Sequence, residues 1–273
     1  MHFHQLAPPD DLRGYVRYFW TLETTGEAPA APQTFTTLAD GCPGLITQLT
    51  PDAPLQGRAN KPWPRSFLYG QTTSATEIVA HGPFQTLGVC FEPSALAAVF
   101  GLNAEELTNT CLDLALLDAP RARGLAEELA ARPTVAERLA QLADFLRSCF
   151  ARHHAPVDAR VRQSLAQLQA SGGRVSLPAL LHEVGMSERS LQRKFKHHVG
   201  ISPQLFARIC RFQASLTQLR ASRFEKLSDL AFEQEYADQS HHIRAFQEFA
   251  GASPLRFRQQ AQPGLSDFPA LLR

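Results

Sequence analysis

The sequence lacks the features that mark membrane-spanning, secreted and disulfide-rich proteins. No window of its 273 residues contains eighteen consecutive apolar residues, which argues against a transmembrane helix and a membrane partner. Residues 1–5 have neither the basic nor the apolar region of a signal peptide, so we expect a cytoplasmic protein. The five cysteines are odd in number, widely spaced and without a C-x-x-C pair, which predicts reduced, buried thiols instead of disulfides or a zinc site.

Motifs of catalysis and cofactor binding are also missing. The sequence has no G-x-S-x-G, no P-loop and no G-x-G-x-x-G. Most of the ten histidines form adjacent pairs, which diverge by about 100° on a helix and therefore cannot easily share one metal ion. Cys42 could be imagined as a redox sensor or an alkyl acceptor, but nothing near it in the sequence would clearly activate the thiol. We therefore expect no enzyme, no metal site and no cofactor.

The net charge of +1 is unevenly distributed along the chain. Residues 158–260 contain 15 Lys and Arg against 9 Asp and Glu, whereas the rest of the chain is acidic. A basic C-terminal part favours an anionic partner such as nucleic acid. The length of the chain and its 44% content of hydrophobic residues are sufficient for two packed domains.

Short apolar or alternating runs dominate the first 92 residues. The runs predict strands at 17–22, 34–38, 45–49, 67–69, 77–80 and 85–91. Turns rich in Gly and Pro separate them, which is typical of a small β-sandwich or barrel. Four aromatic residues either form the core of this domain or line a pocket for an effector: Trp20, Phe35, Trp63 and Phe67.

Helical patterns replace the strands after residue 91. Gly101 stands where a helix over 94–100 would end, and Thr134 with Glu137 forms a capping box at the start of another helix. The apolar stripe of that helix packs either on its own domain or against a second subunit. It contains Val135, Leu139, Leu142, Leu146 and Cys149. A further helix near 157–170 ends at two glycines.

These patterns predict an α+β protein with two domains. Residues 1–155 form a β-rich sensor or dimerisation domain with trailing helices. Residues 156–262 form an all-helical domain, and residues 263–273 form a tail.

The helical domain contains an internal repeat at an offset of 51 residues. Phe195 matches Phe246, Gly200 matches Gly251, and Ser202-Pro203 matches Ser253-Pro254. Each copy reads as a helix, a tight turn, a second helix and a Gly-x-Ser-Pro stop. A repeat of this kind predicts two helix-turn-helix units in tandem.

The second helix of the first copy has two chemically different faces. Leu191 and Phe195, four residues apart, face inward, whereas polar side chains face outward. The outward residues are Arg189, Gln192, Arg193 and Lys196. Gln can bind adenine and Arg can bind guanine through two hydrogen bonds each, and Lys can hold a phosphate.

Residues 175–258 resemble the DNA-binding domain of AraC/XylS-type transcription regulators. The matching motifs are Gly185-Met186-Ser187, Leu191–Lys196, Gly200–Pro203, Arg211, Asp238–His241, Arg244–Phe246 and Gly251-x-Ser253-Pro254. The resemblance implies two recognition helices in successive major grooves of double-stranded DNA. It places Arg189, Ser190, Gln192, Arg193 and Lys196 of the first unit, and Gln239, Ser240, His241 and Arg244 of the second, on the DNA.

The second unit departs from the family pattern at its turn and in its recognition helix. Glu235-Tyr236 replaces a usual Gly-Phe, and His242 replaces a buried aromatic residue or leucine. Ile243 stands where a small polar residue usually meets DNA. We therefore expect the first unit to supply most of the sequence information.

The N-terminal part resembles the β-rich sensor region of some members of this family, through Phe19-Trp20, 38–42, Gly70 and 87–93. The resemblance implies a transcription regulator controlled by a small-molecule effector or by formation of a homodimer. RNA polymerase becomes a partner if the regulator is an activator. Two alternatives stay open: an enzyme, DNA-repair or redox-sensing protein with a helix-turn-helix appendage, and a regulator whose N-terminal domain only contacts other proteins.

Overall fold

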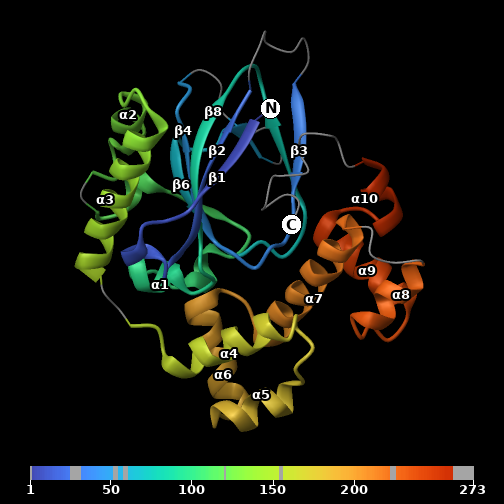
Figure 1. Ribbon diagram of the computed structural model, residues 1–273. Helices are drawn as coiled ribbons and strands as arrows, with labels where there is room; N and C mark the ends of the chain where they lie inside the picture. The colour runs from blue at the N-terminus through green and yellow to red at the C-terminus, as the bar shows by residue number, and fades with distance from the viewer. Residues whose placement is uncertain are drawn as a thin grey trace.

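Two antiparallel sheets pack against each other in the N-terminal part of the chain (Figure 1). The structure is a computed structural model that describes residues 2–24, 32–51, 55–57, 61–119, 121–153, 156–221 and 226–260. The larger sheet has the strand order β1-β2-β8-β4-β6-β9, and the smaller sheet has the order β3-β7-β5. The strands are β1 (His2–Leu6), β2 (Val16–Glu23), β3 (Gln33–Thr37), β4 (Gly44–Gln48), β5 (Leu55–Gln56), β6 (Ser66–Tyr69), β7 (Thr76–Ala80), β8 (Gln85–Phe91) and β9 (Cys111–Asp113).

Each face of the larger sheet is covered by a different layer. One face packs through Trp20 and Leu22 against Phe35 and Ile78 of the smaller sheet. The other face is covered by helices, so β8, at the centre of the sheet, is buried along almost its whole length. A strand that is buried on both faces has a continuous apolar sequence, which is why 85–91 could be recognised from the sequence.

Helices cover the outer face of the larger sheet. They are α1 (Ala95–Phe100), α2 (Leu125–Ala130) and α3 (Val135–His153), with the 3₁₀ helices η1 (Asp10–Leu12), η3 (Ala104–Leu107) and η4 (Leu114–Leu116). Leu142, Leu146 and Cys149 of α3 lie in the core between this helix and the sheet. The apolar stripe of α3 therefore packs mainly on its own domain, which decides the alternative left open by the sequence.

The C-terminal part consists of helices. These are α4 (Ala159–Ala170), α5 (Leu177–Val184), α6 (Glu188–Val199), α7 (Pro203–Arg220), α8 (Leu227–Glu233), α9 (Gln239–Ala250) and α10 (Pro254–Gln260). In Figure 1, α5 and α6 lie at one end of α7, and α8, α9 and α10 lie at its other end. The predicted fold class, a β-rich domain followed by helices and a helical domain, is confirmed. No helix in the described ranges combines the length and the apolar content needed to cross a membrane.

One short segment of the β-rich part packs into the core of the helical part. Leu38 and Ala39 lie in the same apolar cluster as the buried side chains of α7 and α9. The Ala39 N–H donates a hydrogen bond to the Phe249 carbonyl at 3.2 Å, and Gln213 Nε2 donates to the Ala39 carbonyl at 2.6 Å. The domain boundary at residue 155 stays a prediction. A boundary there would assign Leu38 and Ala39 to one domain and the core into which they pack to the other. Residues 263–273, predicted as a tail, lie outside the described residues.

Candidate DNA-binding site

The first helix-turn-helix unit is built by caps that the sequence specifies locally. The Ser176 side chain accepts a hydrogen bond from the Ala179 N–H at 3.3 Å at the start of α5. Gly185 ends α5 with φ +61°, a conformation that glycine adopts without steric cost. Ser187 then caps α6 by accepting from the Ser190 N–H at 3.4 Å. These caps fix the angle at which α6 leaves the turn.

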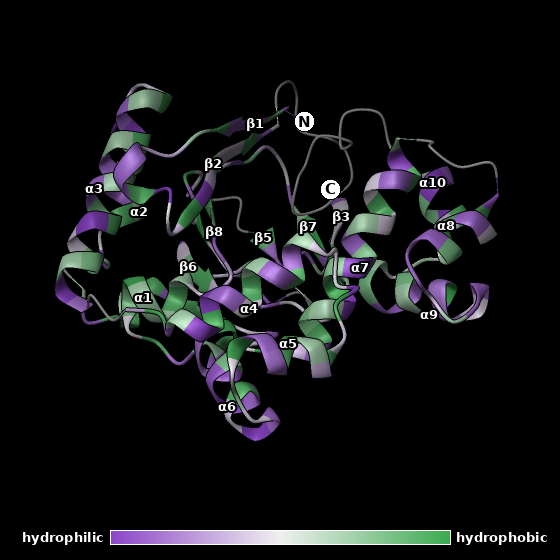
Figure 2. Ribbon diagram, turned by 60° about the horizontal axis from the view of Figure 1, so that its bottom comes forward, coloured by the Kyte–Doolittle hydropathy of each residue, from purple (hydrophilic) through white to green (hydrophobic). Residues whose placement is uncertain are grey.

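The outward face of α6 carries free guanidinium groups. Arg189 and Arg193 are exposed, and neither pairs with another side chain of the described residues. Gln192 is half-buried and donates a hydrogen bond to Glu188 Oε1 at 2.9 Å. Ser190 is half-buried beside these side chains. In Figure 2, α6 lies at the edge of the molecule.

Lys196, at the other end of the same face, is already paired. Its Nζ lies 2.8 Å from Glu105 Oε1 of η3, and both side chains are about half exposed. The next contact along the chain also joins the two domains, because the Thr108 hydroxyl donates to the Gly200 carbonyl at 2.7 Å. The sequence predicts that Lys196 holds a DNA phosphate, and Glu105 would then compete for the same ammonium group.

The second unit repeats this arrangement with a strained turn. Glu235 adopts φ +53°, the left-handed conformation that glycine holds in the first unit, and this conformation is strained for a residue with a Cβ. The cost is roughly 1 kcal/mol. Asp238 caps α9 by accepting from the His241 N–H at 2.8 Å, and this hydrogen bond lowers the pKa of Asp238. All four residues predicted to bind DNA from this unit are exposed: Gln239, Ser240, His241 and Arg244.

His242 is part of the core behind α9. It is fully buried, and its Nε2 lies 2.7 Å from the Ser215 hydroxyl oxygen. The rings of Tyr236 and Phe246 have their centroids 5.0 Å from the imidazole centroid. Burial lowers the pKa of His242 to about 4, so the imidazole is neutral at pH 7.

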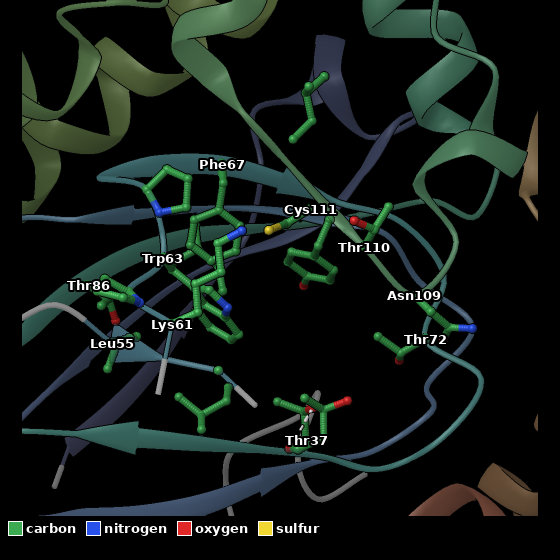
Figure 3. Close-up of a pocket in the computed structure, with 18 of the residues that line it drawn as sticks. Thr37, Leu55, Lys61, Trp63, Phe67, Thr72, Thr86, Asn109, Thr110 and Cys111 are labelled. Carbon is green, nitrogen blue, oxygen red and sulfur yellow. Dashed lines mark hydrogen bonds between the residues drawn. The ribbon is translucent and has the colours of Figure 1, made fainter. Parts of the chain in front are cut away.

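A cavity of about 770 Å³ lies between the two sheets of the N-terminal domain. Trp20, Phe35, Trp63 and Phe67, the four aromatic residues for which the sequence suggested either a core or a pocket, all line it. Figure 3 shows Trp63 and Phe67 close together on one side of the cavity, with Thr37 across from them. Polar groups that line the cavity include Asp40, Lys61, Thr72 and Asn109.

The fold also places a basic group beside Cys42. The residues next to Cys42 in the sequence do not provide one. Arg17, on β2, donates a hydrogen bond from Nη1 to Cys42 Sγ at 2.8 Å. Cys90, on β8, lies beside Cys42. The hydrogen bond between the two thiols, together with burial, raises the pKa of Cys90 well above its usual value. Sequence reasoning missed this cluster, because the pairing of β2, β4 and β8 creates it.

Two family models match separate parts of the chain. Residues 4–113 match a family described as a domain of unknown function (DUF6597). Residues 180–260 match a family described as a helix-turn-helix domain. The second match contains both recognition helices, α6 and α9.

Part of the chain is similar in sequence to a curated relative, and most of the chain aligns with solved structures. The HTH-type transcriptional activator RhaS of Escherichia fergusonii is 31% identical over 103 residues, which are 37% of this chain and 37% of RhaS. ToxT from Vibrio cholerae is 9% identical over 88% of this chain and 98% of its own, with a TM-score of 0.49. The AraC-like transcriptional activator CuxR is 14% identical over 79% of this chain and 86% of its own, with a TM-score of 0.27.

The two structural likenesses are too distant to transfer ligands or activities. The chain also covers little more than a third of the length of RhaS. The capped, repeated helix-turn-helix geometry, the family match over residues 180–260 and the similarity to RhaS nevertheless agree. Together they support the resemblance of the chain to AraC/XylS-type transcription regulators, which the sequence predicts.

Proposed function

We propose that this protein is a one-component, cytoplasmic transcription regulator without catalytic activity that binds duplex DNA through α6 and α9. The doubled, capped helix-turn-helix unit carries this proposal. α7, which separates the two units, has 18 residues and is about 27 Å long. The major groove of B-DNA returns to the same face after about 34 Å. The dimensions therefore suit two successive major grooves on one face of the DNA.

Within this proposal the residues of α6 have separate roles. Arg189, Gln192 and Arg193 contact base edges, because their side chains are long enough to reach the floor of the groove and point outward. Ser190 and Lys196 contact the sugar-phosphate backbone. The two unpaired guanidinium groups in the middle of the helix support this division, since base readers must be free to bind.

The second unit acts mainly as a clamp on the DNA backbone. Gln239, Ser240, His241 and Arg244 offer polar contacts, but the half-buried Ile243 interrupts that face. The strained turn at Glu235 loosens the docking of α9 and brings a negative charge near phosphate. The first unit accordingly supplies most of the sequence information.

The cavity between the sheets supports control by a small molecule. Its volume of about 770 Å³ falls within the range of roughly 300–1,000 Å³ for ligand pockets. Aromatic walls with a few hydroxyl, amide and charged groups suit a compound with a planar apolar body and a polar end. We propose that such an effector changes the affinity of the protein for DNA.

Activation through contact with RNA polymerase is the mode of action that we propose, by analogy with the relative RhaS, whose name describes an activator. Formation of a homodimer through the N-terminal domain is a second mode of control. Light scattering with and without operator DNA distinguishes a monomer from a dimer.

The decisive experiment is the selection of bound duplexes from random DNA by the full-length chain. We expect an enriched site with two halves about one helical turn, or roughly 34 Å, apart. The affinity should fall steeply with salt, as expected for on the order of six phosphate contacts. Equal affinity for all sequences, or no loss of affinity between low and physiological salt, would contradict the proposal. Repeating the selection with small-molecule extracts tests the effector.

A further inference from the structure

Three potential metal ligands meet inside the N-terminal domain. The carboxylate of Asp40 and the thiols of Cys42 and Cys90 have their donor atoms within 4.8 Å of one another. Both cysteines are about 1% exposed, and Asp40 lies at the wall of the cavity. The three residues therefore form a small, enclosed site with a carboxylate at its rim.

Backbone pairing holds the ligands in place. β4 pairs with β8 so that Gly44 lies opposite Cys90, and Cys42 precedes Gly44 by two residues. The Cys42 N–H donates a hydrogen bond to Asp40 Oδ1 at 2.9 Å, which fixes the carboxylate beside the thiol. None of the three ligand atoms stands on a long, flexible side chain. A site with this rigidity loses little conformational entropy when it binds an ion.

The surrounding groups are those that support a metal thiolate. Arg17 Nη1 donates to Cys42 Sγ at 2.8 Å, and the Tyr18 phenol hydrogen-bonds to Cys90. Hydrogen bonds to the ligand atoms orient them and tune the metal, and they are a regular part of metal sites in proteins. Arg17 also lies 3.6 Å from Glu92, which keeps its guanidinium in position.

The charges in this buried space balance with a divalent ion. Two thiolates and the Asp40 carboxylate carry three negative charges, and Arg17 supplies one positive charge. A divalent cation offsets the two charges that Arg17 leaves unbalanced among these ligands, and Glu92, the other partner of Arg17, is about a third exposed to solvent. An uncompensated charge is costly away from water. Sulfur ligands favour a thiophilic ion, whereas Mg²⁺ and Ca²⁺ prefer oxygen.

We propose that Asp40, Cys42 and Cys90 bind one thiophilic divalent cation of the Zn²⁺ or Cd²⁺ class. Zn–S bonds of about 2.3 Å in a tetrahedron place two sulfurs about 3.8 Å apart, which is compatible with the observed spacing. Three protein ligands leave one coordination position for water. The sequence alone predicts no metal site, because the two cysteines are 48 positions apart in the chain and only the sheet brings them together.

The site can be tested by metal titration of the full-length chain, stripped of metal by a chelator and kept reduced by a phosphine. We expect one equivalent of Cd²⁺ to produce the ultraviolet thiolate-to-cadmium absorption band, and Zn²⁺ to compete for the same site. Cys42→Ser and Cys90→Ser should each weaken binding at least 100-fold, and Asp40→Asn at least tenfold. Arg17→Lys, which changes only the surrounding shell, should weaken binding by roughly 10-fold.

The matched controls are Cys111→Ser and Cys149→Ser, which remove thiols elsewhere in the domain and should leave the affinity unchanged. X-ray absorption of the zinc-loaded wild-type chain gives a result that does not depend on the folding of any variant, and we expect two sulfur ligands. Any other number of sulfurs overturns the proposal. Binding of less than one equivalent, or loss of binding in the two controls instead of in Cys42→Ser and Cys90→Ser, also overturns it.

Discussion

At the scale of single residues, two side chains of α6 should differ in what they contribute to DNA binding. We expect Arg193→Ala to relax the preference at one guanine and to cost roughly 1–3 kcal/mol. Lys196→Ala should weaken all sequences about equally, because a phosphate contact carries no sequence information. Binding selections with both variants measure this difference. Identical sequence profiles for the two variants would show that the assignment of roles is wrong.

The pairing of Lys196 with Glu105 leads to a second prediction. Glu105→Gln removes the competitor for the ammonium group, so the affinity for DNA should rise by up to roughly fivefold at low salt. The gain should shrink as salt rises, because exposed charges are screened. Glu106→Gln is the matched control, since it makes the same change of charge on the same turn without a contact to Lys196. If both variants gain equally, the general charge of η3 is responsible instead of the ion pair.

His242 should make the stability of the protein depend on pH. Its pKa of about 4 in the folded state lies below the value near 6.5 expected in the unfolded chain. The unfolded chain therefore binds the proton more readily, and this contribution to stability is present above about pH 6.5. It is lost as the pH falls towards 4, by up to roughly 3 kcal/mol.

Denaturant unfolding at pH 7 and pH 5 measures this loss. The double variant His242→Leu with Ser215→Ala, which leaves no unpartnered hydroxyl, should depend less on pH than the wild type. Ser215→Ala alone, which keeps the buried imidazole, is the control and should retain the pH dependence. A pH dependence that survives in the double variant would assign the effect to other groups.

At the scale of elements, local chemistry made most of the helix ends predictable. Ser176, Ser187 and Ser202 cap the helices that follow them, and Thr134 and Glu137 form the expected reciprocal hydrogen bonds. These signals involve residues within one turn of each other, so a sequence contains them in full. The six predicted strands are also present, with ends shifted by at most a few residues.

Elements and contacts that depend on distant partners could not be predicted. β1 is an edge strand that is mostly exposed and lacks clear apolar alternation. β5 and β9, of two and three residues, are too short for any periodicity. The cluster of Arg17, Cys42 and Cys90 depends on the pairing of strands far apart in the chain, which no local pattern specifies.

The turn between α8 and α9 allows an element-scale test. Glu235→Gly should stabilise the protein by about 1 kcal/mol, because glycine adopts the left-handed conformation without the steric cost borne by glutamate. The ion pair that is lost, Arg174 to Glu235 at 4.0 Å, is long and largely exposed. Gly185→Ala in the first unit should have the opposite sign and a similar size. Chemical denaturation measures both, and equal signs would refute the argument from backbone strain.

At the scale of the whole molecule, the β-rich and helical parts should unfold together. Leu38 and Ala39 complete the helical core, and hydrogen bonds from Gln213 and to Phe249 hold this segment in place. We therefore expect a single calorimetric transition for the full-length chain. Gln213→Ala should weaken the connection and begin to separate the transition into two, whereas Gln218→Ala, further along α7, should not. Two separate transitions in the wild-type chain would contradict this view.

The same segment limits how freely the domains of this protein can be exchanged with those of its relatives. A chimera joined at residue 155 would place Leu38 and Ala39 against a foreign helical domain whose core packs around other side chains. In the reverse chimera, the original α7 and α9 would be left with an unfilled apolar cavity. A functional graft must therefore transfer residues 38–41 together with Phe206, Ile209 and Phe249, which contact them. Recombination between such regulators is then constrained by a few residues deep within the first domain as well as by the linker between the two.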